Sequence, residues 1–337
     1  MIKVGKTKCV YARVVRSLFA GIAVGKSPMG AYQIDIYVVP GSVIQAQIGR
    51  RISEEIILSD KREQLISDLR KIQDNQYQAA DEETPWKYIP LMLDHIGDTD
   101  PEFRDDLIYN TLYEWIEVKE FFNGEQLRGM LSILIDEKHL FYQIGSDGDD
   151  SAFTRTFSML AVALVLSRHK KRAFLSKEEF VHIKNKLIEY YTSELDLRGH
   201  VEQLGWAHAA AHGADAMDEL IQCRECSEDV VKEILHAFKR ILYNGKYIFH
   251  HEEDERISFV AFRVIKGNLL SKQTIIQWVQ ELSECAEWQR DWPQYVVRVN
   301  VKNFIRCLYF KTMRYDSKLD IINEIFNAEE KLNHFLD

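Results

Sequence analysis

Apolar residues recur every three or four positions from residue 61 to the end of the chain, the spacing of one face of an α-helix. Leu65, Leu69 and Ile72 open the pattern. A second helix is predicted after Asp100, which can cap it, with Pro101 in its first turn. The same stepping predicts further helices at about 125–136, 152–168, 177–194, 205–222, 228–243, 253–266, 272–288, 295–310 and 318–335.

The predicted helices come in pairs. Pair starts near residues 103, 152, 205 and 253 are about 50 residues apart, slightly more than the ~40–47 residues of two-helix HEAT or armadillo units. Ser176, with Glu179 three positions later, predicts a capping box at one helix start. A single pair cannot bury its apolar face, so neighbouring pairs must stack. The chain is therefore predicted to be all-α, an α/α superhelix or a HEAT-like stack of helix pairs.

The first sixty residues do not follow this period. β-branched and aromatic residues concentrate in Cys9–Val15, Tyr32–Val39 and Val43–Ile48, with glycine and proline between them. We therefore predict a short irregular or β-containing extension over residues 1–60 and one helical domain over residues 61–337.

Composition narrows the class of protein. With 46% hydrophobic and 28% charged residues, the chain resembles an ordinary soluble globular protein. The formal net charge of −9 makes nucleic acid an unlikely partner, because such binders usually carry a basic balance or stripe. The densest basic run, Arg168–Arg172, falls where a helix should end, and cations there complement the helix dipole. Phosphate binding is the alternative role for this run.

Cysteine usage and hydropathy favour a cytoplasmic location. Five cysteines at scattered positions do not suggest a disulfide framework. Cys223 and Cys226 form a C-x-x-C, but no second such pair exists to complete a four-sulfur zinc site. The most apolar early stretch, Val14–Val24, is interrupted by Arg16 and is too short to span a bilayer. We expect no membrane span.

One predicted helix, Gly205–Leu220, differs from the others in its sequence, GWAHAAAHGADAMDEL. Counted from His208 at about 100° per residue, His212 falls at about 40°, Asp215 at about −20° and Glu219 at about 20°. Two imidazoles and two carboxylates are thus predicted to share one narrow stripe. Alanines flank this stripe, so a neighbouring helix can approach closely and partly enclose it.

The stripe has three interpretations. Histidines four positions apart on a helix can bind one divalent metal such as zinc, with Asp215 as third ligand or as the acceptor that orients a ring. Alternatively, His208, His212 and Asp215 can perform general acid–base catalysis without a metal. The third interpretation is a buried hydrogen-bonded network that only fixes neighbouring helices.

Two neighbouring segments are candidates to complete the site. Asp196–Gly199 closes the preceding helix, and Glu253–Arg256 opens the next helix pair. Adjacent helices in a stack bring such segments together. The resulting candidate ligand-binding residues are Asp196, Arg198, Trp206, Glu255 and Arg256. For the acidic residues, the alternative is that they complement the dipole of the helix they begin.

Together these segments, DLRG, GWAHAAAHGAD and EDER, resemble the pattern of a bacterial family catalogued as a domain of unknown function, family 2785. The motif is long and specific, and the resemblance covers roughly residues 60–335. It implies an all-helical, cytoplasmic protein. It implies no activity.

Two functions fit these observations. One is an enzyme or ligand-binding protein whose site is His208, His212 and Asp215, where a metal-activated water would perform hydrolysis. The other is a helical scaffold that binds a protein on its concave face, while the motif holds helices together. Most late aromatic residues are expected in the core, with an exposed patch at Trp288 and Trp292 as the alternative.

Overall fold

Contacts between residues divide the chain into two units, Met1–Asp60 and Lys61–Asp337, which are described separately. The computed structural model describes residues 25–26, 32–33, 60–81, 83–289 and 291–335. In the first unit, β1 (Gly25–Lys26) pairs antiparallel with β2 (Tyr32–Gln33). Apart from the start of Tyr32–Val39, the predicted strands lie outside the described residues. The N-terminal extension therefore stays a prediction.

The second unit is all-α apart from two two-residue strands, as the sequence predicts, and the first helix described in it covers residues 61–74. The later elements are α3 (Thr84–Asp94), η1 (Glu102–Tyr109), α4 (Asn110–Tyr113), η2 (Glu114–Val118), α5 (Gly124–Leu134), α6 (Ser151–Lys171), α7 (Lys177–Ser193), β3 (His200–Val201), β4 (Gly205–Trp206), α8 (Ala209–Ile221), α9 (Glu228–Leu242), α10 (Glu253–Lys266), α11 (Lys272–Ser283), η3 (Glu284–Glu287), α12 (Trp292–Tyr315) and α13 (Ile321–Leu332).

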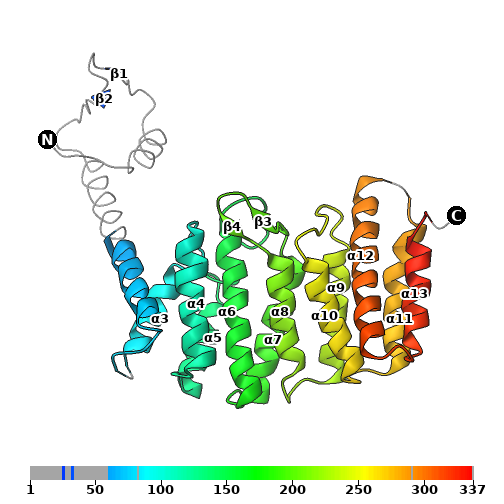
Figure 1. Ribbon diagram of the computed structural model, residues 1–337, viewed down its shortest axis with the longest axis horizontal. Helices are drawn as coiled ribbons and strands as arrows, with labels where there is room; N and C mark the ends of the chain where they lie inside the picture. Colours follow the sequence, from blue (N-terminus) through cyan, green and yellow to red (C-terminus); the bar gives the residue numbers. More distant parts are fainter. Residues whose placement is uncertain (1–24, 27–31, 34–59, 82, 290, 336–337) are drawn as a thin grey trace. The chain divides into compact units, whose positions relative to one another are not determined.

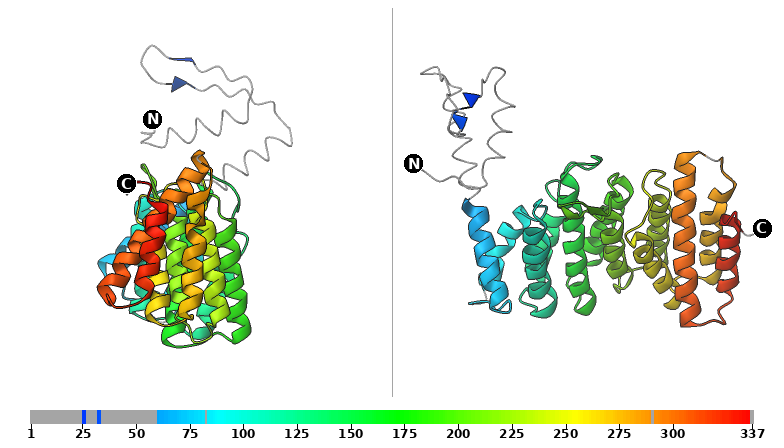
Figure 2. Two further views of the ribbon diagram at one scale, coloured as in Figure 1. Left: turned by 90° about the vertical axis from the view of Figure 1, so that its right-hand side faces the viewer. Right: turned by 45° about the horizontal axis from the view of Figure 1, so that its top comes forward.

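The helices of this unit lie side by side, broadly in chain order, with α12 next to α10 and α11 next to α13 (Figure 1). In one row, α6 packs against α8, α8 against α10 and α10 against α12. In addition, α7 packs against both α8 and α9, and α11 packs against α13. Figure 2 shows the same packing from two further directions. The arrangement fits a stack of packed helix pairs. That these pairs are copies of a sequence repeat stays a prediction.

Local sequence signals place several helix ends correctly. The side chain of Ser176 accepts a hydrogen bond from the backbone N–H of Glu179, and the Glu179 side chain accepts one from that of Ser176, so the predicted capping box is confirmed. Helix α10 spans the predicted residues 253–266. Helix α3 was not predicted, since Pro90 inside it lacks the N–H that a helix interior normally uses.

Apolar side chains form one core along the unit. Large aromatic residues are fully buried in it, among them Trp115, Phe180, Phe238 and Phe304. Trp292, by contrast, is 64% exposed and stacks on Tyr295, with 5.4 Å between ring centroids. Trp288 is also exposed. Within residues 60–81, 83–289 and 291–335, no helix combines the length and apolar character needed to cross a membrane.

Candidate functional site

The first residues of the long predicted helix are not helical. Gly205–Trp206 forms β4, which pairs antiparallel with β3 (His200–Val201), and α8 begins at Ala209. The prediction of one helix over Gly205–Leu220 was therefore wrong at its start. It was correct for the portion that carries His212 and the two carboxylates.

Backbone hydrogen bonds explain this difference. The N–H groups of Ala207 and His208 donate to the carbonyl oxygens of Gly199 and Arg198, each at 2.9 Å. His208 consequently has a φ of 55°, in the left-handed region. That conformation costs a non-glycine residue about 1–3 kcal/mol. The angular argument from the sequence therefore fails for His208, which lies just outside α8.

The His208 side chain is buried where α8 and α10 begin. Its Nε2 donates to the backbone oxygen of His251 at 2.9 Å and lies 3.6 Å from Oε1 of Glu253. Its ring stacks on Trp206, with 4.7 Å between centroids and 22° between planes. Burial lowers the pKa of His208, and the Glu253 carboxylate opposes this shift. His208 thus links the starts of the two helices.

Glu253 connects the three motif segments. Its carboxylate is buried and accepts a hydrogen bond from the backbone N–H of His251 at 2.8 Å. A Cβ atom at Gly199 would lie 2.2 Å from Nδ1 of His251 and 2.6 Å from Oε1 of Glu253, so this close approach requires glycine. DLRG, GWAHAAAHGAD and EDER therefore meet in space, with Glu253 as the acidic residue beside His208.

Three other candidate ligand-binding residues make structural contacts. Nη2 of Arg198 donates to Oδ2 of Asp196 at 2.6 Å, and the same carboxylate accepts from the N–H of Gly148 at 2.9 Å. Glu255 forms an ion pair with Lys311 on α12. Asp196 and Arg198 thereby secure the loop before α6, and Glu255 joins α10 to α12. A role in ligand binding stays a prediction for all three.

His212 lies within α8 and is buried. Its ring meets Phe157 and His208 edge to face, with centroid distances of 5.4 Å and 5.6 Å. Among the described residues, Nδ1 of His212 has no hydrogen-bond partner. Burial, with a smaller effect of His208, lowers the pKa of His212 to about 3. The ring is therefore neutral at physiological pH.

This burial predicts a pH-dependent stability. Between its ordinary pKa of 6.5 and its folded pKa of about 3, His212 takes up a proton in the unfolded chain but not in the folded one. Its contribution to the free energy of unfolding should therefore fall by about 1.4 kcal/mol for each pH unit below about 6.5. Urea unfolding of the wild type and His212→Gln at about pH 7, 6 and 5 checks this. The variant should lose less stability, and equal losses would contradict the assignment.

Asp215 pairs with a residue of the third segment. Nη1 of Arg256 donates to Oδ1 and Oδ2 of Asp215 at 2.7 and 2.9 Å. Further along the same two helices, Nε of Arg263 donates to Oδ1 of Asp218 at 2.6 Å. Burial raises the pKa of Asp215, whereas Arg256 acts to lower it. These ion pairs hold α8 and α10 side by side.

The donor arrangement does not resemble a metal site. In the described part of the chain, no group of three or more His, Cys, Asp or Glu side chains is placed to hold a metal ion. Nε2 of His208 is engaged by a carbonyl oxygen and Asp215 by Arg256. Burial also raises the pKa of Cys223 to about 12 and that of Cys226 to about 11, so both are neutral thiols. Metal binding by His208, His212 and Asp215 stays a prediction that no donor cluster in the described residues supports.

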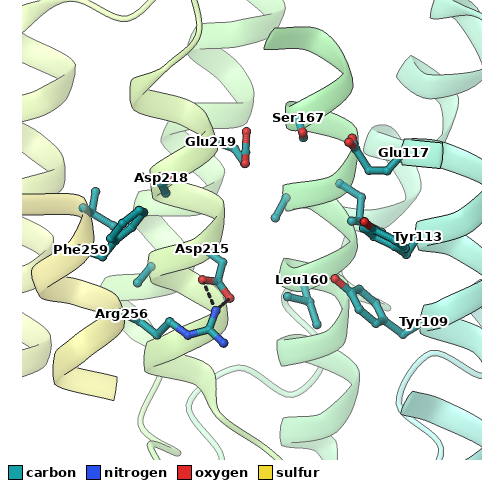
Figure 3. A pocket seen from close by; sticks show the side chains of 14 residues that line it. Tyr109, Tyr113, Glu117, Leu160, Ser167, Asp215, Asp218, Glu219, Arg256 and Phe259 are labelled. Carbon is teal, nitrogen blue, oxygen red and sulfur yellow. Dashed lines mark hydrogen bonds and ion pairs between the residues drawn. The ribbon is translucent and has the colours of Figure 1, made fainter. Parts of the chain in front are cut away.

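A groove of about 330 Å³ opens beside the Asp215–Arg256 pair (Figure 3). Aromatic side chains line it from two directions, Tyr109 and Tyr113 on one side and Phe259 on the other. The remaining lining residues are Glu117, Leu160, Ala163, Leu164, Ser167, Ala214, Asp218, Glu219 and Val260. Of the predicted site residues, Asp215 and Arg256 line this groove, and His208 and His212 lie outside it.

The wall formed by Tyr109, Tyr113 and Glu117 depends on π-helical turns. Tyr109 ends η1, Tyr113 ends α4 and Glu117 belongs to η2. On an α-helix, residues four apart drift by about 40° per step, and the wider π-turn shifts them in the opposite direction. The alternation of π-helical and α-helical turns keeps the three side chains on one side of the helix, pointing into the groove (Figure 3). Sequence reasoning missed them because apolar spacing does not distinguish the two turn types.

Basic residues from the end of α6 support the groove's acidic side chains. Nζ of Lys170 lies 2.5 Å from Oε2 of Glu219, and Lys171 forms an ion pair with Glu117. Burial raises the pKa of Glu219 despite its lysine. The predicted basic run at this helix end is thus engaged in ion pairs, which agrees with its interpretation as a helix terminus.

A comparison with protein families identifies the family of this chain. A family model described as "Protein of unknown function (DUF2785)" matches residues 140–310. The matched span contains α6, α8 and α10, and Tyr109, Tyr113 and Glu117 lie before it. No curated protein and no solved structure matches the chain.

Proposed function

The chain belongs to the DUF2785 family of proteins of unknown function, and we propose that this member binds a small organic ligand in the groove lined by η1, α4, η2, α6, α8 and α10. Binding sites for small molecules are concave and mostly apolar, with a few polar groups that fix orientation. The groove has this composition, and its volume of about 330 Å³ suits a small molecule.

The π-helical wall is the observation that carries this proposal. Two π-helical segments, Glu102–Tyr109 and Glu114–Val118, border the groove and carry Tyr109 and Glu117, and the α-helical turn between them carries Tyr113. π-turns are rare because their hydrogen bonding is less favourable, and they occur frequently at functional sites. A purely structural helix would have no need of this distortion beside a groove.

His208 has a positioning role in this proposal. His208 and Glu252, the residues before α8 and α10, have φ values of 55° and 68°. Left-handed residues persist where surrounding contacts hold them, and they cluster at functional sites. The His208 hydrogen bond to His251 fixes the starts of the two helices that present Asp215 and Arg256 to the groove.

Three other predictions remain open beside this proposal. Hydrolysis by a metal-activated water at His208, His212 and Asp215 is not required for binding in the groove. A scaffold that binds a protein partner is the alternative function, and the exposed Trp292 stacked on Tyr295 favours it. A cytoplasmic location is likewise a prediction from the sequence.

A variant whose larger side chain fills the groove tests the proposal. Ser167 lines the groove and is partly exposed, so Ser167→Phe should occupy the ligand space without disturbing the core. Thr192→Phe, at a partly exposed position on α7 outside the groove, is the matched control. A library of cationic, neutral and anionic fragments is screened by thermal shift and ligand-observed NMR. Fragments that bind the wild type should still bind Thr192→Phe and should lose at least about tenfold in affinity for Ser167→Phe.

Two results would overturn this function. One is a screen without any hit for the wild type. The other is a set of hits that bind Ser167→Phe as tightly as the wild type, which would place their site elsewhere. Far-UV circular dichroism and the melting temperature of both variants establish that the comparison is made between folded proteins.

A further inference from the structure

Glu117 has an unused acceptor inside the groove. Its side chain is only 10% exposed, and it forms an ion pair with Lys171 through Oε2. The other carboxylate oxygen, Oε1, is buried and has no hydrogen-bond partner among the described residues. A buried acceptor without a donor costs about 1–3 kcal/mol, and more when it is charged. Figure 3 shows this carboxylate directed toward the groove, so a ligand can supply the missing donor.

The charge of the lining has the sign that suits a cation. The described lining residues include carboxylates at Glu117, Asp215, Asp218 and Glu219 and a guanidinium at Arg256. The lysines that pair with Glu117 and Glu219, and the arginine that pairs with Asp218, approach from outside the lining. Each of these carboxylates is already ion-paired, so the groove favours a cation through the carboxylate oxygens that line it and not through a net charge.

The aromatic walls suit the same ligand. Tyr113 and Phe259 are each 43% exposed at the groove, so their ring faces are accessible. Phe259 already has the guanidinium of Arg263 5.0 Å from its ring centroid. A cation over an aromatic face contributes about 0.5–2 kcal/mol, depending on its desolvation. The apolar floor, which includes Leu160 and Leu164, provides contact for a carbon skeleton.

We infer that the ligand of this groove is a small organic cation, with a protonated amine directed at Glu117 and an apolar or aromatic skeleton on the floor formed by α6. This inference rests on the proposed function and specifies its ligand class. The ammonium donates to the free oxygen of Glu117, where a charge-assisted hydrogen bond is stronger than a neutral one.

Three probes with one carbon skeleton separate charge from shape. 4-Phenylbutylamine, 4-phenylbutanol and 4-phenylbutyrate carry a positive, a neutral and a negative head group. Calorimetric titration of the full chain at low ionic strength should give a Kd about tenfold lower for the amine than for the alcohol. The carboxylate should bind most weakly. Added salt should weaken the binding of the amine and leave the affinity for the alcohol unchanged.

A pair of isosteric variants locates the contact. Glu117→Gln removes the charge in the groove, and the preference for the amine over the alcohol should disappear. Glu120→Gln is the matched control, because Glu120 pairs with Arg168 and lies outside the groove. This variant should retain the full preference. The same preference in both variants would overturn the role of Glu117.

The outcomes separate this inference from the proposed function. If amine and alcohol bind equally, and Ser167→Phe abolishes both, the groove binds ligands but does not select cations. If 4-phenylbutyrate binds most tightly of the three probes, Arg256 determines the charge preference and the inference is wrong. If none of the probes binds while other fragments lose binding in Ser167→Phe, the ligand class is wrong and the proposed function stands. If nothing binds at all, both are overturned.

Discussion

Arg155→Met is expected to reduce the free energy of unfolding by about 3–5 kcal/mol. The Arg155 guanidinium is fully buried and donates to both oxygens of Glu194, at 2.6 and 2.9 Å. Glu194 is itself only 4% exposed, so the substitution leaves its carboxylate buried without its cation. The melting temperature should fall by about 10 °C for a unit of this size. Urea unfolding and differential scanning calorimetry measure the two quantities.

Arg62→Met is the matched control for this prediction. Arg62 also binds a carboxylate through two nitrogens, to Asp98 at 2.7 and 2.8 Å. Its side chain is 26% exposed, so water screens the pair and solvates the remaining carboxylate. The expected loss is about 1 kcal/mol or less. A double variant, Arg155→Met with Glu194→Leu, should recover part of the stability. Similar losses in Arg155→Met and Arg62→Met would show that burial does not control these pairs.

Gly213→Ala should destabilise the protein by about 1–3 kcal/mol, although alanine is the better helix former. A Cβ atom at this position would lie 2.1 Å from Cε2 of Tyr191. That ring is buried between α7 and α8, and its hydroxyl donates to the backbone oxygen of Ala210 at 2.9 Å. It cannot move without losing this hydrogen bond and its packing. The melting temperature should fall by several degrees.

Gly129→Ala makes the same substitution in another helix. A Cβ atom there would meet Cη2 of Trp86 at 3.5 Å, an ordinary van der Waals distance. Alanine should therefore stabilise α5 by up to about 1 kcal/mol through its helix propensity. The two substitutions are expected to have opposite signs. A stabilising effect of Gly213→Ala would mean that the contact between α7 and α8 is looser than the structure indicates.

The candidate site shows how much single-sequence reasoning can recover. The stripe on α8 was predicted from 100° steps, and Asp215 and Glu219 do lie on one side of the helix, where both line the groove. The expectation that adjacent helices in a stack bring three distant segments together is also met, because these segments lie around His208 and Glu253. The sequence analysis selected Glu255 as a site residue, whereas Glu253 is the acidic residue beside His208. Spacing alone cannot tell which of several neighbouring carboxylates turns inward.

Helical structure was determined by the sequence itself, because its causes are local. Apolar spacing depends on residues three and four apart, and the Ser176 cap acts on a group three residues away. The partners that shape the site are distant in sequence. His208 binds the backbone of His251, Asp215 binds Arg256, and β4 pairs with β3. Those contacts, together with the π-turns that direct Tyr109 and Glu117 into the groove, were decided only by the tertiary structure. Packing between helices stabilises the π-turns and the left-handed His208, although each is locally less favourable than a regular α-helix.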